Sequence, residues 1–388
     1  MSWARGQYLL LETKRRRSGG VHRVILRYIL MHDSVIVFPE RFRKPDWLLN
    51  LEVSPEAVLH LDGKTANCTA HIAEAKGISD PVLGAFTRKY GQEIVRSRYW
   101  GQRTYVQFKI GNAFEDYDLE NLHYTELEVA FDAIAEEYDR HIYGNPMNSW
   151  LRAVSVGLMK SVFRPGSVVV DVGCGTGTET LSLAAHGVKV LACDVSARML
   201  AVLRRKAENA GLSENIMTFH CTPATLHLRL SEAGFKDLDG AYSTYGAFNT
   251  DPNPKRFAKN LHDLLSPGAS LILGVWNKYY PLEVAGYVLR GKLGLACARW
   301  FNPVPIGKSR FCVSSYAYSS REVSAILSPY FKQRRLIGTE IVLPPSNLTK
   351  YLPRRKILAV LKKLDLWTGS TYPMNRLGDH FLGEYERE

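Results

Sequence analysis

The sequence of 388 residues predicts an α/β fold, a doubly wound Rossmann-like sheet preceded by a small β-rich domain. Three observations predict it. Short apolar and β-branched runs fill residues 1–112 and are separated by turn signals. From residue 128 onward, helical and strand-like segments alternate, as they do around a parallel sheet. A glycine-rich loop follows the first apolar strand of this second part, where folds of this type bind ligands.

The first part of the chain is expected to be a barrel or a sandwich, because it combines many short strands with a single helix. Its strand candidates are Tyr8–Thr13, Val24–Leu30, Val35–Phe38, Ala57–Leu61, Thr65–Ile72 and Thr104–Ile110. The basic stretch Lys14–Gly20 is expected to be a turn. Asp62-Gly63 is typical of a hairpin. The one helix is expected to open at Asp80-Pro81 and to end near Tyr90.

Polar and acidic residues 113–127 are expected to link the two domains, 1–112 and 128–388. Beyond the linker, apolar residues recur at helical spacing up to Ile142, and a second helix is expected over Leu151–Phe163. The strands that follow are expected at 167–170, 189–193, 217–221, 240–243 and 271–276, and the helices at 179–186, 197–210 and 254–265. Residues 266–268 are expected to form a turn. This order predicts a parallel sheet.

The glycine-rich loop has the pattern D-x-G-x-G-x-G, with Gly173, Gly175 and Gly177 between a buried strand and a helix. Glycines at these positions let the backbone turn sharply and approach a ligand closely. A dinucleotide site would need G-x-G-x-x-G, but the third position here is Thr178, so that fingerprint is absent.

Two aspartates give the loop its chemistry. The carboxylate of Asp171 at the end of the strand would repel a pyrophosphate and favours a ligand with a positive group, such as an ammonium. Asp194 ends the next strand, where an acid can accept both hydroxyls of a ribose. The sequence therefore predicts a nucleoside site with an amino-acid moiety nearby.

Over residues 128–388 the chain resembles the class I S-adenosylmethionine-dependent methyltransferases. The resemblance implies that S-adenosylmethionine is the cofactor, that the three loop glycines line its methionine side and that Asp194 holds its ribose. Tyr138, within Phe131–Asp139, corresponds to the lid helix that covers the cofactor in many members; the alternative is a tyrosine that only packs in a helix. Relatives often carry an aspartate that contacts adenine, and here Thr222 or a backbone carbonyl would take that contact.

The methyl acceptor is expected to be a small molecule, by elimination. The Asn/Asp-Pro-Pro-aromatic tetrad of DNA amino-methylating enzymes, a Pro-Cys nucleophile and the paired glutamates of protein-arginine enzymes are all absent after the fourth strand. Tyr245 and Asn249 are candidate acceptor residues by position, and His141 and His380 are candidate bases. Each of the four has a purely structural alternative. The catalytic residue stays open, and no metal site is expected.

Residues 8–110 resemble the deazaflavin-dependent nitroreductase family, a split β-barrel related to flavin-binding oxidases. The similarity lies in Leu9–Arg23, in Lys44–Leu51 and in Lys89-Tyr90-Gly91. It implies a deazaflavin of the F420 type, or FMN, as a second cofactor. Residues 38–44 lack the glycines usual in that family, so a degenerate barrel that binds substrate or pairs subunits is the alternative. The residues expected at the second cofactor are Arg15, Arg17, Ser18, Trp47 and Asn50.

The net charge of +12 is spread along the chain, so we expect no nucleic-acid partner. The scattered cysteines and the lack of a leader-like N-terminus or a long apolar run predict a cytoplasmic protein without a membrane span. Pro353–Leu364 is a basic amphipathic stretch; it either touches an anionic membrane or packs on its own domain. A homodimer formed through the barrel is also expected.

Three functions are compatible with these features. The first is methylation of a small molecule by an enzyme with an appended flavin-type barrel. The second couples deazaflavin-dependent reduction and methylation of one metabolite, or methylates a quinone-like lipid at a membrane surface. The third, a non-enzymatic or nucleic-acid-binding module, is disfavoured by the intact glycine loop and by Asp194.

Overall fold

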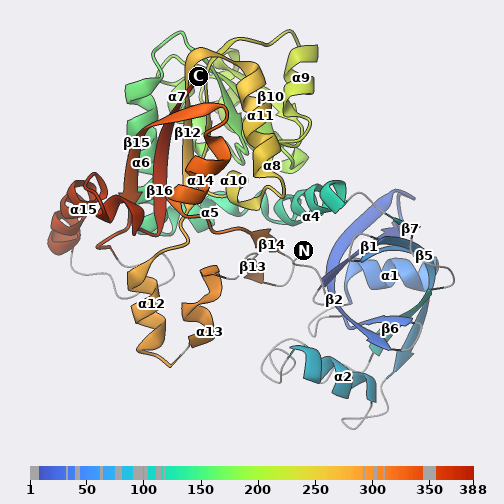
Figure 1. Cartoon of the computed structure of the whole chain (residues 1–388). Coiled ribbons are helices and arrows are strands. Elements are labelled where there is room, and N and C mark those ends of the chain that lie inside the picture. The colour runs from blue at the N-terminus through green and yellow to red at the C-terminus, as the bar shows by residue number, and fades with distance from the viewer. Residues whose placement is uncertain are drawn as a thin grey trace. The chain divides into compact units, whose positions relative to one another are not determined.

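The computed structural model describes residues 8–31, 34–39, 44–61, 64–74, 81–90, 99, 104–110, 115–116, 119–291, 293–300, 304–308, 311–343 and 355–388. The chain divides into two compact units. The first is Met1–Ala130 with Gly307–Cys312, and the second is Phe131–Ile306 with Val313–Glu388. Figure 1 shows a β-rich first unit, in blue, and a larger second unit in which helices flank a central sheet.

The first unit is a closed barrel, so the sandwich alternative is wrong. Its strands are β1 (Tyr8–Lys14), β2 (Val21–Met31), β3 (Ser34–Val37), β4 (Glu56–Leu61), β5 (Lys64–Glu74), β6 (Thr104–Ile110) and the short β7 (Glu115–Asp116). The order is β4-β1-β2-β3-β6-β5, and pairing of β4 with β5 closes the ring of six. All of these neighbours are antiparallel. Asp62-Gly63, the expected turn between β4 and β5, lies outside the described residues.

The barrel contains a helix that the sequence analysis missed. Besides the expected α2 (Pro81–Tyr90), α1 spans Asp46–Val53 and contributes Trp47, Leu48 and Leu51 to the barrel core. Its signals were present in the sequence: a proline at the N-cap, an acid in the first turn and apolar residues three and four apart. The single-helix expectation is therefore wrong.

The second unit is built on a mixed sheet of seven strands. These are β8 (Val168–Val172), β9 (Lys189–Asp194), β10 (Ile216–His220), β11 (Leu238–Ser243), β12 (Leu265–Trp276), β15 (Phe331–Thr339) and β16 (His380–Arg387). The order is β10-β9-β8-β11-β12-β16-β15. The first five strands are parallel, as expected, but β16 runs antiparallel to both of its neighbours, so an all-parallel sheet is wrong. Residues 266–268, expected as a turn, belong to β12.

Helices cover both faces of this sheet, which confirms the doubly wound arrangement. The described helices from residue 119 onward are α4 (Leu119–Ile134), α5 (Tyr138–Tyr143), α6 (Pro146–Val162), α7 (Thr178–Ala184), α8 (Ala197–Asn209), α9 (Leu226–Glu232), α10 (Ala247–Thr250), α11 (Pro254–Leu264), α12 (Pro281–Val288), α13 (Leu293–Ala296), α14 (Ser320–Leu327) and α15 (Arg355–Gly369). Val170 of β8 packs in one apolar cluster, with α9, α11 and α14, whereas Val169 packs in another, with α6 and α7. Helix α4 begins inside the expected linker.

A few elements stand apart from this layering. Strands β13 (Val304–Lys308) and β14 (Phe311–Ser315) form a separate pair. Three short 3₁₀ turns complete the described chain, at Ser213–Asn215, Ala298–Trp300 and Met374–Arg376. Among the described residues, no helix has both the length and the apolar character needed to cross a membrane.

The strand order locates the place where a ligand would bind. The chain leaves β8 toward β9 and β10 on one side and later adds β11 and β12 on the other. In open α/β sheets such a switch point opens a crevice beyond the carboxyl ends of the strands. Here it lies beyond the ends of β8 and β11, where the glycine-rich loop begins.

Candidate active site

The three loop glycines all have left-handed backbone conformations, with φ of 78° at Gly173, 53° at Gly175 and 79° at Gly177. A Cβ at Gly173 would lie 2.2 Å from a side chain of α10, and one at Gly177 would lie 2.0 Å from a side chain of α8. A Cβ at Gly175 would meet only the ring of Tyr138, at an ordinary 3.7 Å. The outer glycines are therefore needed for packing, whereas Gly175 leaves space in front of the loop.

Asp194 closes the other side of this space. Its side chain is only 8% exposed, and each of its oxygens accepts one backbone hydrogen bond of 2.8 Å, from Gly175 and from Ser196. Each oxygen keeps a lone pair for a further donor, so the carboxylate is suited to two neighbouring hydroxyls. Burial raises the pKa of Asp194 to about 6, although the two backbone donors oppose the shift.

Asp171 lies deeper than the sequence suggested. It is 3% exposed, and the hydroxyl of Thr180 in the first turn of α7 donates a hydrogen bond of 2.6 Å to it. Burial raises the pKa of Asp171 to about 8, and the nearby carboxylates of Glu179 and Asp194 contribute in the same direction. The described contacts of Asp171 tie β8 to α7, and a contact with a ligand ammonium stays a prediction.

The segment formed by α4 and α5 is fastened to the loop by polar contacts. Asp139 of α5 accepts hydrogen bonds from the hydroxyl of Thr176 and from Lys206, the latter at 2.8 Å. Lys206 also donates to the carbonyl of Thr176 at 2.8 Å. Asp132 of α4 accepts from the hydroxyl of Ser196 at 2.6 Å. These contacts hold the segment against both ends of the site.

Tyr138 lies in this segment beside Gly175, and burial raises the pKa of its hydroxyl. Next to it is an ion pair that the sequence analysis missed, between Arg152 of α6 and the buried Glu179 of α7. No local pattern announces such a pair, because its residues lie 27 positions apart.

Thr222 follows β10, the neighbour of β9, at the same edge of the sheet. Its hydroxyl lies 3.2 Å from that of Thr225, and the backbone N–H of Thr225 donates to it at 3.3 Å. The contacts therefore cap the turn before α9. A contact with adenine stays a prediction.

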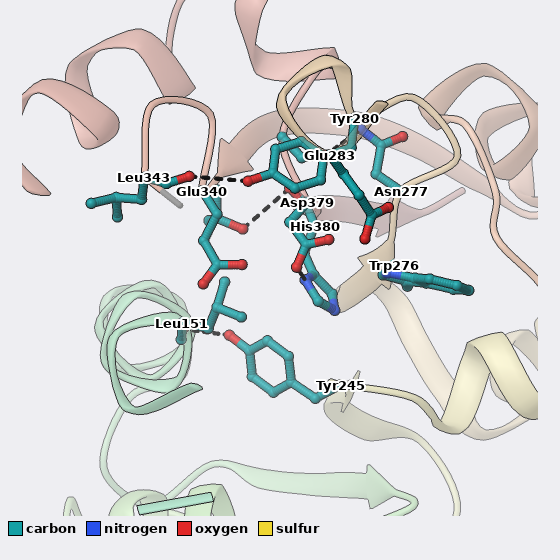
Figure 2. Close-up of polar contacts among 12 residues, drawn as sticks. Leu151, Tyr245, Trp276, Asn277, Tyr280, Glu283, Glu340, Leu343, Asp379 and His380 are labelled. Atoms are coloured by element: carbon teal, nitrogen blue, oxygen red, sulfur yellow. Dashed lines mark hydrogen bonds and ion pairs between the residues drawn. The ribbon is translucent and has the colours of Figure 1, made fainter. Parts of the chain in front are cut away.

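Tyr245 and His380 lie together at the end of β11. Tyr245 has a φ of 55° and donates a hydrogen bond from its hydroxyl to the carbonyl of Leu151. Its ring packs edge-on against the imidazole of His380, with 5.8 Å between ring centroids (Figure 2). His380 begins β16 and pairs with Trp276 at the end of β12, so two of the four expected acceptor-side residues meet at one edge.

Asn249 and His141 differ from this pair. The amide nitrogen of Asn249 donates to the carbonyls of Trp276 and Tyr316, and its oxygen accepts from the N–H of Trp276 at 2.8 Å. The side chain is buried and holds backbone segments together. The side chain of His141 lies outside the described residues.

Behind His380 lies a buried charged network. The Nδ1 atom of His380 is 3.3 Å from an oxygen of Asp379, whose other oxygen pairs with Arg299. Arg299 also pairs with Glu283 at 2.5 Å. Burial alone would raise the pKa of Asp379, but Arg299 and then His380 hold it far below its ordinary value. Asp379 is therefore ionised and lies directly beside the imidazole.

In the barrel, the residues expected at a second cofactor fall into two groups. Trp47 and Asn50 are buried; Trp47 packs in the core, and the Asn50 oxygen accepts from the N–H of Arg16 at 3.2 Å. Arg15, Arg17 and Ser18 are exposed on the turn between β1 and β2. The exposed group alone faces solvent, and its role in binding a cofactor stays a prediction.

Comparisons with known proteins match a different family in each unit. A family model described as a methyltransferase domain matches residues 169–268, and one described as F420H(2)-dependent quinone reductase matches residues 1–81. Among curated relatives, tRNA 5-carboxymethoxyuridine methyltransferase of Escherichia coli strain K12 is 28% identical over 38% of this chain and 57% of its own length. Demethylmenaquinone methyltransferase of Symbiobacterium thermophilum is 29% identical over 50% of this chain and 75% of its own.

The solved structure of a putative S-adenosylmethionine-dependent methyltransferase from Listeria monocytogenes matches with a TM-score of 0.44 and 20% identity, over 62% of this chain and 99% of that one. The first-ranked curated relative is matched over little more than half of its length. The second unit therefore carries a methyltransferase domain over residues 169–268, which holds the glycine loop and Asp194, and the first unit resembles the F420H2-dependent quinone reductase family over residues 1–81.

Proposed function

We propose that the chain transfers a methyl group from S-adenosylmethionine to a small aromatic acceptor that carries a hydroxyl group. The observation that carries the proposal is the meeting of two sets of residues at one edge of the sheet. Gly175 and Asp194 lie together where a nucleoside would bind, and Tyr245 and His380 lie at the ends of β11 and β12. The acceptor would bind on the side of Tyr245 and His380.

The residues at the switch point suit the cofactor. The two free lone pairs of Asp194 match the two hydroxyls of a ribose, and the space at Gly175 lies under Tyr138. Thr222 is at the strand edge where the base would lie. The cofactor supplies an electrophilic methyl group, and the protein aligns the acceptor with it and excludes water.

His380 is our candidate base. An ionised Asp379 beside Nδ1 favours the tautomer with a proton on that atom, which leaves Nε2 free to accept a proton. A hydroxyl of the acceptor would lose its proton to Nε2 as it attacks the methyl group. Asp379 orients the ring and stabilises the imidazolium that forms.

Two observations favour a quinol-type acceptor. Relatives of the second unit include enzymes named for demethylmenaquinone and for ubiquinone biosynthesis. The family matched by the first unit is named for reduction of quinones, and that reaction produces the hydroxyls that an O-methyltransferase needs. The second candidate function is therefore a bifunctional one, in which the barrel reduces a quinone and the methyltransferase unit methylates the product.

The test measures S-adenosylhomocysteine formation with matched acceptors. A hydroquinone is expected to be methylated directly, and the corresponding quinone only when a reduced deazaflavin is added. Methylation of the hydroquinone without any reduction of the quinone would leave the barrel as an accessory domain. If the folded protein methylates a tRNA transcript and no small phenol or hydroquinone, the proposed acceptor class is wrong.

The exposed turn of the barrel is our candidate for the phosphate of the deazaflavin. Arg17 and the backbone N–H of Ser18 are accessible there, whereas Arg16 is paired with Asp46. Binding is followed by the absorbance of the oxidised cofactor after gel filtration. An Arg17→Ala variant is expected to lose it, and an Arg164→Ala variant, changed at an exposed site on the other unit, is not.

We also propose that helix α15 contacts an anionic membrane surface. Ile357, Val360, Leu364 and Trp367 are spaced three, four and three residues apart and are all exposed, and Lys363 is exposed beside them. An apolar helix stripe flanked by lysine suits an anionic lipid surface. Cosedimentation with phosphatidylglycerol vesicles is expected for the wild type and lost in Val360→Glu/Trp367→Glu. Equal binding by the double variant would contradict the proposal.

A further inference from the structure

Glu340 is the most unusual acidic residue among those the structure describes. It follows the last residue of β15, its side chain is 0% exposed, and neither carboxyl oxygen receives a hydrogen bond from a described group. Its backbone is left-handed, with a φ of 57°, a conformation that a side chain other than glycine adopts at a cost. Strained residues of this kind concentrate at functional sites.

The strain is held in place by a second buried acid. Asp365 of α15 is 1% exposed, and its carboxylate accepts the backbone N–H groups of Glu340, Ile341 and Val342, at 2.9, 2.7 and 3.0 Å. Three hydrogen bonds to one carboxylate fix the backbone of this turn. Helix α15, through Asp365, therefore holds the backbone of Glu340 in its left-handed conformation.

Within the part of the chain that the structure describes, no positively charged side chain pairs with Glu340. A carboxylate oxygen of Asp379 and a ring nitrogen of His380 lie within 4.8 Å of a carboxyl oxygen of Glu340. Arg299 is already shared between Asp379 and Glu283. The nearby phenols are also committed as donors: Tyr280 to the carbonyl of Leu343 at 3.0 Å, and Tyr245 to that of Leu151.

A buried carboxylate without a donor is strongly disfavoured, and the smallest remedy is a proton. Burial raises the pKa of Glu340 well above its ordinary value, and the negative charge of Asp379 beside it adds to the shift. Glu340 thus differs from Asp379, which Arg299 keeps ionised. Two acids in one network, one neutral and one charged, are suited to different roles.

We propose that Glu340 is a neutral carboxylic acid that donates a hydrogen bond to the methyl acceptor, at an oxygen other than the one that is methylated. Figure 2 shows its carboxyl group on the same side of the turn as the phenol of Tyr245 and the imidazole of His380. The inference rests on the proposed function and narrows the acceptor class. The acceptor would be a phenol or enol conjugated with a second oxygen, as in a hydroxyquinone or an ortho-hydroxy carbonyl compound.

The chemistry balances as follows. The acceptor hydroxyl gives its proton to Nε2 of His380. Its oxygen forms a bond to the methyl carbon while the carbon–sulfur bond breaks and the electron pair stays on sulfur. As the hydroxyl ionises, negative charge spreads to the conjugated oxygen, and the hydrogen bond from Glu340 strengthens there without transfer of its proton.

The first test needs no acceptor. Infrared difference spectra at neutral pH, with ¹³C-labelled glutamate to separate glutamate from aspartate bands, are expected to show the carbonyl band of a protonated glutamic acid. The band should be missing in Glu340→Gln and retained in Glu386→Gln, a matched change of a partly exposed glutamate on β16. Absence of the band from the wild type would overturn the inference.

The second test compares Glu340→Gln, which keeps a donor, with Glu340→Leu, which loses it. With an acceptor that carries the second oxygen, kcat is expected to fall about 100-fold in Glu340→Leu and only several-fold in Glu340→Gln. With an acceptor that lacks it, the three proteins should differ little. The alkaline decline of kcat in the wild type, where Glu340 ionises, should be absent from Glu340→Gln.

Two outcomes would contradict the inference. One is equal activity of Glu340→Leu and wild type on both acceptors. The other is binding of Mg²⁺ or Zn²⁺ by the wild type and not by Glu340→Gln, since a cation would then take the place of the proton. Titration with S-adenosylhomocysteine separates this failure from failure of the proposed function, because all three proteins should bind it equally.

Discussion

At the scale of single residues, the glycine-rich loop divides its work between packing and ligand space. Gly173 and Gly177 are needed because neighbouring side chains occupy the positions of their Cβ atoms. Gly175 has room for a Cβ, but that atom would enter the space beside Tyr138. The three glycines look equivalent in the sequence and differ in the structure.

We expect Gly175→Ala to weaken cofactor binding more than it weakens the fold. The left-handed backbone costs an alanine about 1 kcal/mol, and the methyl group narrows the space in front of the loop. Gly234→Ala is the matched control, because Gly234 also has a positive φ and open surroundings but lies far along the chain from the loop. Thermal melts and S-adenosylhomocysteine titrations should show similar destabilisation in both and loss of affinity only at Gly175.

The pKa of Asp194 makes cofactor affinity depend on pH. Ribose hydroxyls donate to the ionised carboxylate, so binding favours ionisation and affinity rises as pH rises through about 6. Affinity for S-adenosylhomocysteine at pH 5 should be about tenfold lower than at pH 7.5, and it should level off above that. Asp194→Asn, which does not titrate, should bind weakly with no such step. If the wild-type affinity did not change between pH 5 and pH 7.5, this assignment would be contradicted.

The placement of the loop glycines and of Asp194 at one edge of the sheet was predictable because their pattern is local; that they bind the cofactor stays a prediction. The loop and the acid that ends the next strand are read from adjacent positions. Glu340, Arg152 and Arg299 were not predictable, because their partners lie on other strands and helices. A left-handed glutamate held by Asp365 leaves no trace in a single sequence.

At the scale of elements, the α4–α5 segment is held to the glycine loop mainly by the partly buried pair of Lys206 and Asp139. A second pair, Arg205 of α8 with Glu136 between α4 and α5, is largely exposed and does not reach the loop. Exposed ion pairs contribute little, whereas a lysine that also bonds a loop carbonyl positions two elements at once.

Lys206→Met is therefore expected to loosen this lid. Dissociation of S-adenosylhomocysteine, measured by stopped flow, should become about 3- to 10-fold faster, as loss of one or two charge-assisted hydrogen bonds implies. Arg205→Met changes the adjacent residue of the same helix and should leave the rate unaltered. Equal effects of the two substitutions would mean that the segment does not act as a lid.

The sequence pattern did not predict elements whose conformation depends on contacts with distant parts of the chain. Strands β15 and β16 were not expected, since they lie far from the alternating part of the chain and join it in antiparallel pairing. Helix α1 is short, and its apolar residues face the barrel core; in the sequence these residues look only like a short apolar run. The segment expected to be a linker instead contains β7 and the start of α4.

At the scale of the whole molecule, each unit has its own apolar core. We expect calorimetric unfolding in two transitions because the cores share no described residue. S-adenosylhomocysteine at 100 times its Kd should stabilise the methyltransferase unit by about 2.7 kcal/mol and raise only one transition. A single transition that shifts as a whole would show that the units unfold together.

Everything proposed for the second unit depends on Gly175 and Asp194 forming a site for S-adenosylmethionine. Its most direct test is a calorimetric titration of the full chain with S-adenosylhomocysteine, repeated with Asp194→Ala. We expect one ligand per chain for the wild type and an affinity at least about tenfold weaker for the variant, because two hydrogen bonds to a charged group are lost. Unchanged affinity in a folded Asp194→Ala protein, or no binding by the wild type, would contradict it.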